Sequence, residues 1–437
     1  MNFTEAQNYL LSLHNLPRLE YLTDPSHCEV YLKRLQFLLD ILGNPEKKIP
    51  RYIHVTGTSG KGSVCLFLDS ILRTAGWRVG LNTSPHLQSI TERFTINGKQ
   101  ISKKDFCQLV EYIKPKLDQY SATSPYDFPS YFEILEAMIL LHFARKKVSW
   151  AIIEVGCGGR YDSTNVIPRK DIAVITNIGL DHVGIIGRNK KEIAYEKAGI
   201  IKRGARVFTQ ECNKKILGII RRECKKQNAS LKIFNFQFSI FKQFLNKTIF
   251  NYQNDEYSLS CLGIHQIRNA ILGIEIAKSL NIPHATIKRG LAKAKLPLRM
   301  ETVSRNPLII LDGAHNPDKM KTTVDTIKNL KLKIKNCHIV AGFSADKNIS
   351  RMITQLASLK PKTIACTRNT TNPFREAADP SALAKQFKKL LPKAKIKIFL
   401  DPSDAFAWSK SKTKTGDILL VTGSIFLSGE LRSQFKV

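Results

Sequence analysis

Short apolar runs alternate with amphipathic stretches along most of the chain. The first set of runs predicts strands at 52–55, 79–82, 151–155, 172–176 and 206–209. Buried strands that alternate with helical stretches are typical of a mainly parallel α/β sheet. The pattern therefore predicts an α/β nucleotide-binding fold for the first part of the chain.

The pattern changes twice further along the chain. Residues 231–261 form short β-like runs with polar turns, which predict a small antiparallel appendage, and the helical pattern resumes at 264–280. A second strand and helix alternation starts after Leu296 and Pro297 and continues to the end. Its predicted strands are 308–311, 338–341, 363–366, 395–400 and 418–421. We therefore expect a domain boundary near Pro297.

A glycine-rich turn with one lysine follows the first predicted strand. Gly57, Gly60 and Gly62 let backbone N–H groups approach phosphate oxygens, Lys61 adds a cation, and 64–74 reads as the helix that follows. This layout predicts a phosphate-binding loop for a nucleoside triphosphate. A glycine turn without a ligand is the weaker alternative, because a strand precedes the turn and a helix follows it.

These features define the expected fold class. We expect a P-loop ATPase-type domain at 1–297, with a mainly parallel sheet and the antiparallel appendage, and a Rossmann-like α/β domain at 298–437. Gly62 separates Lys61 from Ser63, so the hydroxyl is displaced from the usual metal position of such loops. The metal ion is then expected to be held elsewhere.

Composition bounds the class of protein further. A chain of 437 residues with 43% hydrophobic content can bury a large core in two or three domains. Its nine cysteines include no Cys-x-x-Cys pair, which argues against a disulfide framework or a thiolate metal site. No apolar run approaches a membrane span, and residues 1–21 lack a basic start before an apolar block. We expect a cytoplasmic location and no membrane partner.

The formal net charge is +32, and a positive charge of this size is typical of proteins that bind nucleic acid. The basic residues are spread out, however, and short runs such as Lys190 with Lys191 or Arg221 with Arg222 fit solvated helix faces. No basic and aromatic strip accompanies them. We therefore expect no nucleic-acid partner and a general preference for anionic substrates.

Polar clusters follow three of the predicted strands, at 83–86, 154–162 and 180–182. Open parallel sheets bind their ligands at these strand ends, so Ser84, Glu154 and His182 are candidate ligands for Mg²⁺. Each has a plain alternative. Ser84 is also suited to open a turn, Glu154 to cap a helix or pair with Arg160, and His182 to be an ordinary loop histidine.

These motifs together resemble the Mur-ligase superfamily, and within it the folylpolyglutamate synthase and dihydrofolate synthase branch, over nearly the whole chain. The matching segments are 57–63, 83–86, 130–133, 154–160, 180–182, 196–202, 265–266 with Asn269, 311–317 and 421–424. A glycine directly after the loop lysine, here Gly62 after Lys61, is itself typical of this branch. The resemblance implies an ATP-dependent ligase that joins L-glutamate to a folate carboxylate through an acyl phosphate, with ATP and Mg²⁺.

The resemblance also assigns roles to residues. It implies that ATP is bound by Thr58, Ser59, Gly60, Lys61, Gly62, Ser63, Asn269, Arg299 and Asp312. It implies Mg²⁺ ligation by Ser84, Glu154 and His182, a carbamate on Lys197, and a role for His315 with glutamate or the acyl phosphate. The plain alternatives are a helix N-cap for Asp312, surface pairing for Arg299 and Asn269, and a surface position for Lys197.

Substrate contacts and oligomeric state complete the expectations. The resemblance matches Tyr131, Phe132 and Asp162 to contacts with the pterin-bearing substrate, although both aromatic residues also suit the start of a core helix. Segment 16–26 departs from the Ile-Asp-Leu-Gly pattern of relatives that use dihydropteroate, so polyglutamylation of folates is favoured over that activity. We expect a monomer whose two domains close over ATP through a hinge at 296–299.

Two other classes remain as alternatives. A peptidoglycan-precursor ligase would share the ATP chemistry, but it would carry a Gly-Lys-Thr-Thr-like loop and a separate N-terminal domain. A nucleic-acid-binding P-loop NTPase would share the loop and the positive charge. Neither matches the motifs as fully.

Overall fold

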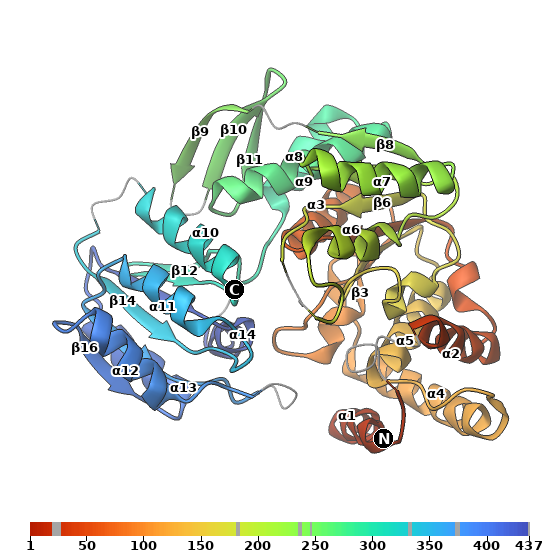
Figure 1. Cartoon of the computed structure of the whole chain (residues 1–437), viewed down its shortest axis with the longest axis horizontal. Coiled ribbons are helices and arrows are strands. Elements are labelled where there is room, and N and C mark those ends of the chain that lie inside the picture. Colours follow the sequence, from red (N-terminus) through yellow and green to blue (C-terminus); the bar gives the residue numbers. More distant parts are fainter. Residues whose placement is uncertain are drawn as a thin grey trace. The chain divides into compact units, whose positions relative to one another are not determined.

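The computed structural model of the chain describes residues 1–19, 28–180, 184–234, 238–244, 247–330, 334–371 and 376–435. It divides into two compact units (Figure 1). The first contains Met1–Gln237 and Arg268–Leu291, and the second contains Phe238–Ile267 and Ala292–Val437. The division of the chain at residue 297 stays a prediction.

The first unit is built on an eight-stranded sheet of order β4-β3-β2-β5-β1-β6-β7-β8. Its strands from β2 to β8 in that order are parallel, and β3 and β4 add an antiparallel edge. The bounds are β1 Tyr52–Thr56, β2 Val79–Asn82, β3 Thr95–Ile96, β4 Lys99–Gln100, β5 Trp150–Glu154, β6 Ile172–Ile175, β7 Arg206–Thr209 and β8 Ser230–Ile233. The predicted mainly parallel sheet is confirmed, with strand ends shifted by a residue at most.

One expectation for this region is wrong. Residues from 231 were assigned to the appendage, but Leu231 and Lys232 lie in β8, which pairs in parallel with β7 at the sheet edge. The alternation of Ser230–Ile233 is too short to separate the last strand of one sheet from the first strand of another. Register with β7, which the sequence does not encode locally, decides the assignment.

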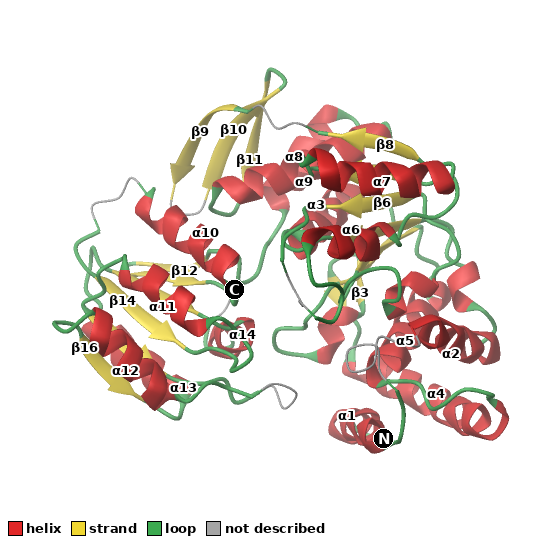
Figure 2. Ribbon diagram, viewed as in Figure 1, coloured by secondary structure: helices red, strands yellow, loops and turns green. Residues whose placement is uncertain are grey.

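Helices pack against the sheet of this unit (Figure 2). One core joins α2, α4 and α5 to Ala151 and Ile153 of the sheet, and another joins α6 and α7 to Ala173 and Val207. The helices are α1 Phe3–Ser12, α2 Cys28–Ile41, α3 Lys61–Thr74, α4 Lys103–Thr123, α5 Tyr131–Arg145, α6 Lys190–Ala198 and α7 Lys214–Lys226, together with most of α8 Ile264–Ser279 and α9 His284–Lys293.

The second unit holds two sheets. The predicted antiparallel appendage is confirmed as a three-stranded sheet of β9 Ser239–Phe244, β10 Lys247–Tyr252 and β11 Asp255–Leu259. The other sheet has the order β12-β13-β17-β14-β15-β16 and is parallel except for β12. Its strands are β12 Glu301–Arg305, β13 Leu308–Leu311, β14 Cys337–Ala341, β15 Thr363–Cys366, β16 Lys395–Ile398 and β17 Ile418–Thr422. The accompanying helices are α10 Pro317–Lys328, α11 Ile349–Ala357, α12 Pro380–Leu390, α13 Pro402–Lys412 and α14 Ile425–Arg432.

The nine cysteines are all free thiols, and six of them are buried. None of the helices in the described ranges is both long and apolar enough to cross a bilayer.

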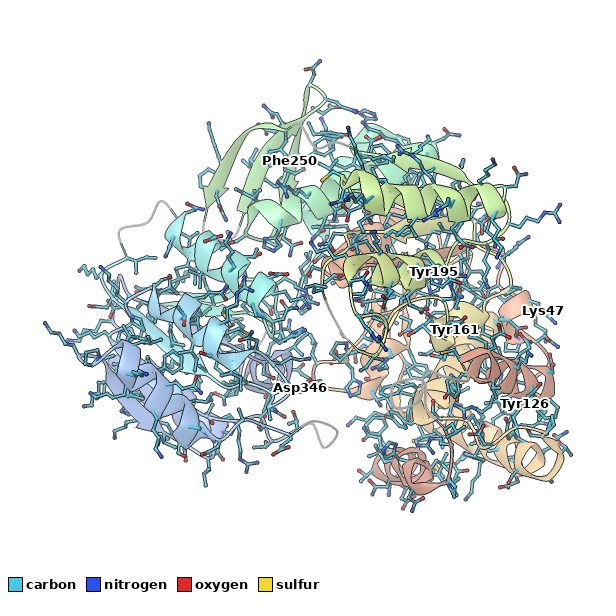
Figure 3. All side chains as sticks on the ribbon, viewed as in Figure 1. Lys47, Tyr126, Tyr161, Tyr195, Phe250 and Asp346 are labelled. Carbon is cyan, nitrogen blue, oxygen red and sulfur yellow. The ribbon has the colours of Figure 1, made fainter. Side chains whose placement is uncertain are left out.

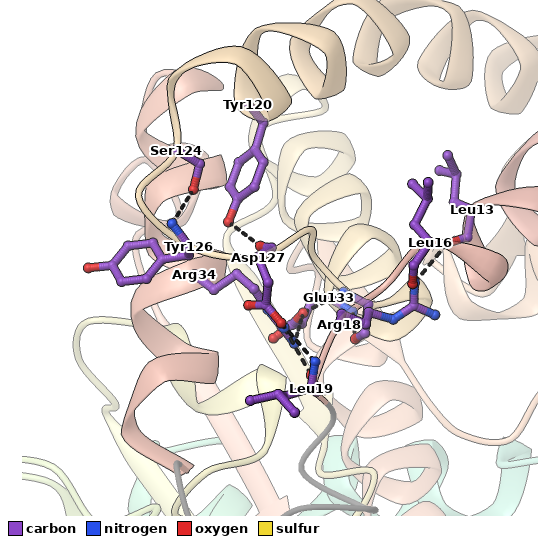
Figure 4. A network of polar contacts seen from close by, with 11 residues as sticks. Leu13, Leu16, Arg18, Leu19, Arg34, Tyr120, Ser124, Tyr126, Asp127 and Glu133 are labelled. Carbon is purple, nitrogen blue, oxygen red and sulfur yellow. Dashed lines mark hydrogen bonds and ion pairs between the residues drawn. The ribbon is translucent and has the colours of Figure 1, made fainter.

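A buried arginine fixes the start of α5, which matters because α5 begins with two candidate substrate contacts. Arg34 of α2 is 1% exposed and pairs with Asp127 at 2.9 Å and with Glu133 at 2.7 Å (Figure 4). Glu133 in turn accepts from Ser130 N at 2.6 Å in a capping box at the helix start. The backbone of Leu19 joins the same network through Asp127.

We predict that Arg34→Ala lowers the free energy of unfolding by about 3–5 kcal/mol, because Glu133 is then left buried without its cation. Urea unfolding of the purified protein measures this loss. The neighbouring Lys33 is exposed, so Lys33→Ala is the control and should change stability by less than about 0.5 kcal/mol. Equal stability of the two variants would contradict the role of the buried pair.

Candidate functional site

The loop between β1 and α3 has a backbone that only glycine allows. Gly60, the N-cap of α3, has φ 86°, and a Cβ there would lie 2.4 Å from Asn269 Oδ1. Gly57 has φ 146°, and its Cβ would lie 1.8 Å from Thr176 Oγ1. A loop that must stay free of side chains at a helix N-terminus is a ready anion site.

Hydrogen bonds from the segment after β6 hold this loop in place. Thr58 N donates to Asn177 O at 2.9 Å, and Ser59 N donates to Asn177 Oδ1 at 2.8 Å. Thr176 Oγ1 donates to Ser59 O at 2.6 Å. The loop is therefore anchored from a second strand end, while Gly62 and Ser63 are buried in the first turn of α3.

Two lysines reach the same backbone oxygen of the loop. Lys61 Nζ donates to Gly57 O at 3.0 Å, and Lys197 Nζ donates to it at 3.2 Å. The alternative that Lys197 is a surface lysine is wrong, since it is 3% exposed. Gly159 permits this arrangement, because a Cβ there would lie 2.9 Å from the carbonyl oxygen of Glu196 in α6. The loop after β5 and the end of α6 thus pack backbone against backbone.

The proposed metal ligands lie at the ends of β2 and β5. Ser84 N donates to Glu154 Oε2 at 3.0 Å, which brings a hydroxyl residue beside a carboxylate that is 5% exposed. Hard oxygen donors of this kind fit Mg²⁺. His182 lies outside the described residues, and within the described ranges no three His, Cys, Asp or Glu side chains gather as a metal cluster. Arg160, the alternative partner of Glu154, pairs with Glu223 at 2.9 Å.

Asn269 of α8 lies against the phosphate loop. It is 4% exposed, and its amide stands where a Cβ of Gly60 would be. The alternative of surface pairing is therefore wrong for this residue. Its expected contact with a bound nucleotide stays a prediction.

The three expected substrate contacts all lie in the first unit. Tyr131 is 6% exposed, whereas the neighbouring Phe132 is 44% exposed and its ring lies beneath Arg93 Cζ at 5.9 Å. Asp162 is buried and accepts from Cys157 N at 2.8 Å and from Thr164 N at 3.1 Å. An exposed aromatic face beside an arginine suits a flat heterocycle better than it suits a core position.

Arg93 and His86 are site neighbours that the sequence did not single out. Arg93 Nε donates to His86 Nδ1 at 3.2 Å. Burial and the charge of Arg93 lower the pKa of His86 to about 4, so this histidine is a neutral acceptor. The signal was available, because His86 follows the Thr-Ser-Pro motif at the end of β2.

Glu136 of α5 is a further residue that the sequence analysis missed. It is 3% exposed and accepts from Asn82 Nδ2 at 2.9 Å, at the end of β2. Burial and the nearby charge of Asp162 raise the pKa of Glu136 to about 8, against an opposing effect of Arg93 and Asn82. The raised pKa favours the protonated form of Glu136 near pH 7, and a protonated carboxyl group can donate as well as accept.

Three candidates lie in the second unit. Asp312 follows β13 and accepts from Met300 N at 3.0 Å, from Ala314 N at 3.1 Å and from Thr323 Oγ1 at 2.6 Å. The N-cap alternative is wrong, since Asn316 caps α10. Burial raises the pKa of Asp312 despite these hydrogen bonds.

His315 and Arg299 complete that group. His315 Nδ1 lies 2.8 Å from Gly313 O, and its Nε2 lies 3.0 Å from Lys319 Nζ. Burial, and then the charge of Lys319, hold the pKa of His315 well below its usual range. Arg299 is half-buried and contacts the Pro297 carbonyl oxygen at 3.3 Å, and its charge acts on the carboxyl group of Asp312.

An open cavity of about 850 Å³ lies beside the start of α2 and the outer side of α6. Tyr161 and Tyr195, both labelled in Figure 3, line it together with Ile185, Ile186 and Ile219. Tyr161 stands directly before Asp162, and Arg160 Cζ lies 4.0 Å from the centre of the Tyr195 ring. The cavity thus adjoins the loop that carries Asp162.

The first unit therefore has the parts of a phosphate-binding α/β enzyme, with glycines, two lysines and oxygen ligands at strand ends. Comparison with known families agrees. Residues 55–277 match the Mur ligase middle domain, and residues 298–425 match the Mur ligase glutamate ligase domain.

Individual relatives narrow the family. The chain is 37% identical over 423 residues to the dihydrofolate synthase/folylpolyglutamate synthase of Bacillus subtilis, covering 93% of this chain and 95% of that protein. It is 33% identical over 371 residues to the folylpolyglutamate synthase of Lacticaseibacillus casei, covering 82% and 83%. The structure of Mycobacterium tuberculosis folylpolyglutamate synthase complexed with ADP and AMPPCP superposes with a TM-score of 0.86 at 28% identity, covering 100% and 99%.

The chain belongs to the Mur ligase family, and within that family to the folylpolyglutamate synthase and dihydrofolate synthase branch. The resemblance inferred from its motifs is confirmed. The peptidoglycan-precursor ligase and the nucleic-acid-binding NTPase are not favoured.

We predict that Glu136→Gln removes a pH-dependent part of the stability. A carboxyl group whose pKa is raised by folding stabilises the fold fully below its usual pKa, and this stabilisation is lost as the pH rises through about 8. The melting temperature of the wild-type protein should therefore fall between pH 6 and pH 9 relative to Glu136→Gln, whose amide is neutral throughout.

Exposed Glu29 supplies the control, because Glu29→Gln should leave the pH dependence of the melting temperature as it is in the wild type. Parallel curves for wild type and Glu136→Gln would show that Glu136 is not held neutral by the fold.

Proposed function

We propose that this protein is an ATP-dependent ligase that adds L-glutamate to the carboxylate of folates, the activity of a folylpolyglutamate synthase. The observation that carries the proposal is the position of Lys61 in a glycine loop at the N-terminus of α3, where its amine lies 3.0 Å from Gly57 O. A cation beside a helix N-terminus favours a polyphosphate, and the family supplies the reaction.

We expect the reaction to proceed in two steps, phosphoryl transfer to the carboxylate and then amide formation. A folate carboxylate oxygen attacks the γ-phosphorus of ATP, the bond to the β-phosphate oxygen breaks, and ADP leaves. The amine of glutamate then attacks the acyl carbon, the carbon–oxygen bond breaks, and phosphate leaves with one oxygen of the original carboxylate. A proton is lost from the amine, and an amide remains.

Residues of the first unit would bind and orient the reactants. The loop from Thr58 to Ser63, with Asn269, would hold the ATP phosphates, and Arg299 and Asp312 of the second unit would contact the nucleotide. Phe132, Tyr131 and Asp162 would hold the pterin end of the folate. His315 would contact glutamate or the acyl phosphate.

Ser84 and Glu154, with His182, would hold Mg²⁺, which neutralises charge on phosphate oxygens when bound. The hydrogen bond from Ser84 N to Glu154 Oε2 supports a shared site for the hydroxyl and the carboxylate. Removing one ligand should raise the Mg²⁺ concentration needed for half-maximal activity.

An assay of glutamate incorporation tests the proposal. Radiolabelled glutamate, ATP and Mg²⁺ are supplied with tetrahydrofolate in one series and with dihydropteroate in another. Incorporation into tetrahydrofolate establishes polyglutamylation, and incorporation into dihydropteroate adds the dihydrofolate synthase activity. No incorporation in either series would overturn the proposal. A monomeric state and a cytoplasmic location stay predictions.

Lys61→Ala should lower kcat by at least about a hundredfold while the protein stays folded, since Lys61 is partly exposed and its amine serves the phosphates rather than the core. Glutamate incorporation together with a thermal melt measures both effects. Near-normal turnover of a folded Lys61→Ala protein would contradict the assignment of this loop to phosphate binding.

We further propose that the neutral amine of Lys197 adds to CO₂ in the active enzyme, forming an N–C bond and losing one proton to give a carbamate. Lys197 is buried, and its Nζ lies 3.2 Å from Gly57 O, which the amine of Lys61 also contacts. A carbamate on Lys197 would turn one of these two neighbouring cations into an anion and so remove their repulsion. Lys197→Ala should lose most activity and regain part of it with added acetate, whereas Lys197→Arg should stay impaired. Full activity of Lys197→Arg would contradict the carbamate.

A further inference from the structure

A line of buried hydrogen bonds runs from the middle of β1 to the loop after β5. His54 of β1 is fully buried, and its Nε2 lies 2.8 Å from Thr164 Oγ1. The Thr164 hydroxyl in turn donates to Asp162 Oδ1. All three side chains are at most 8% exposed, so water does not compete with these bonds.

The direction of the line follows from its proton count. A threonine hydroxyl has one proton, and Thr164 gives it to Asp162, so His54 Nε2 must be the donor toward Thr164. His54 Nδ1 is then unprotonated, and it has no hydrogen-bond partner in the part of the chain that the structure describes. Burial, and then the charges of Lys170 and Lys202, hold the pKa of His54 well below its usual range. A neutral ring with its proton on Nε2 satisfies all of these observations.

The line ends on a carboxylate that acts only as an acceptor. Oδ1 of Asp162 accepts from the hydroxyl and the backbone N of Thr164, and Oδ2 accepts from Cys157 N at 2.8 Å. A carboxylate offers about four acceptor positions, so about one remains for a ligand. A ligand group at that position has to be a hydrogen-bond donor.

We propose that His54 is a positioning residue for substrate recognition, which acts through Thr164 to fix the orientation of the Asp162 carboxylate and to commit it to accepting an N–H group of the substrate heterocycle. This inference rests on the proposed function, since Asp162 is there assigned to the pterin end of the folate. It adds two residues, on β1 and on the turn after Asp162, to the groups that determine which heterocycle is bound.

A purely structural role makes a different prediction. If His54 only fills the core and Asp162 only caps the short helix Ser163–Val166, changes at His54 or Thr164 would lower stability and affect all substrates alike. A positioning role affects the KM for the folate and spares the KM for ATP. The conservative variants separate the two, because serine keeps the Thr164 hydroxyl and glutamine places an N–H near the position of His54 Nε2.

The test measures KM for tetrahydrofolate, ATP and glutamate in wild type, Thr164→Val, Thr164→Ser, His54→Leu and His54→Gln. Thr164→Val and His54→Leu should each raise the KM for tetrahydrofolate about tenfold, the effect of one hydrogen bond, with the KM for ATP unchanged. Thr164→Ser and His54→Gln should restore most of the wild-type value. The double variant should be no worse than either single variant, because both break the same line.

A wild-type KM for tetrahydrofolate in folded Thr164→Val, or an equal rise in the KM for ATP, would overturn the proposal. If His54→Leu does not fold, the two Thr164 variants decide. Nitrogen-15 NMR of the histidine rings adds a readout that needs no activity: the expected state has the proton on His54 Nε2, and a proton on Nδ1 would overturn the proposal. The wild-type rate alone tests the proposed function, so the two failures are distinct.

Discussion

The Gly57 carbonyl oxygen accepts hydrogen bonds from the amines of Lys61 and Lys197, and the packing of the first unit around the loop depends on this contact. Three segments must meet at one point: the loop after β1, the loop after β5 and the end of α6. Gly57 and Gly159 make this possible, because a side chain at either position would collide with a neighbouring segment. Two neighbouring cations repel each other, so the arrangement calls for an anion at this place.

The groups that surround this point come from segments far apart in the sequence and are tied together by buried polar contacts. Asn82 at the end of β2 bonds to Glu136 of α5, and the start of α5 is held by Arg34 through Glu133. Burial and the charge of Asp162 raise the pKa of Glu136. Glu136 can therefore donate a hydrogen bond in a site where the Asp162 carboxylate accepts them. Phosphate chemistry and heterocycle recognition can therefore lie side by side in the first unit.

The strands and the phosphate loop were predictable because both depend on local pattern: apolar runs give the strands, and glycines around one lysine give the loop. The burial of Lys197 was not predictable, because the short helix α6 is charged along most of its length and shows no apolar stripe. Its burial depends on the contact of Gly159 with Glu196, which joins segments whose pairing no local rule encodes. Glu136 did leave a signal, as a single acid within the apolar stretch Ile134 to Leu141. The edge strand β8 was misassigned because its partner, and not its own residues, decides its sheet.

Oxygen-isotope tracing tests the central claim most directly. The folate substrate is prepared with oxygen-18 in its reacting carboxylate and turned over with ATP and glutamate, and the products are separated by mass. Transfer through an acyl phosphate moves one labelled oxygen per turnover into inorganic phosphate and leaves the other in the amide. Label in AMP would show an acyl adenylate, and unlabelled phosphate would show that no bond forms between the carboxylate and the γ-phosphorus. Either result would contradict the account.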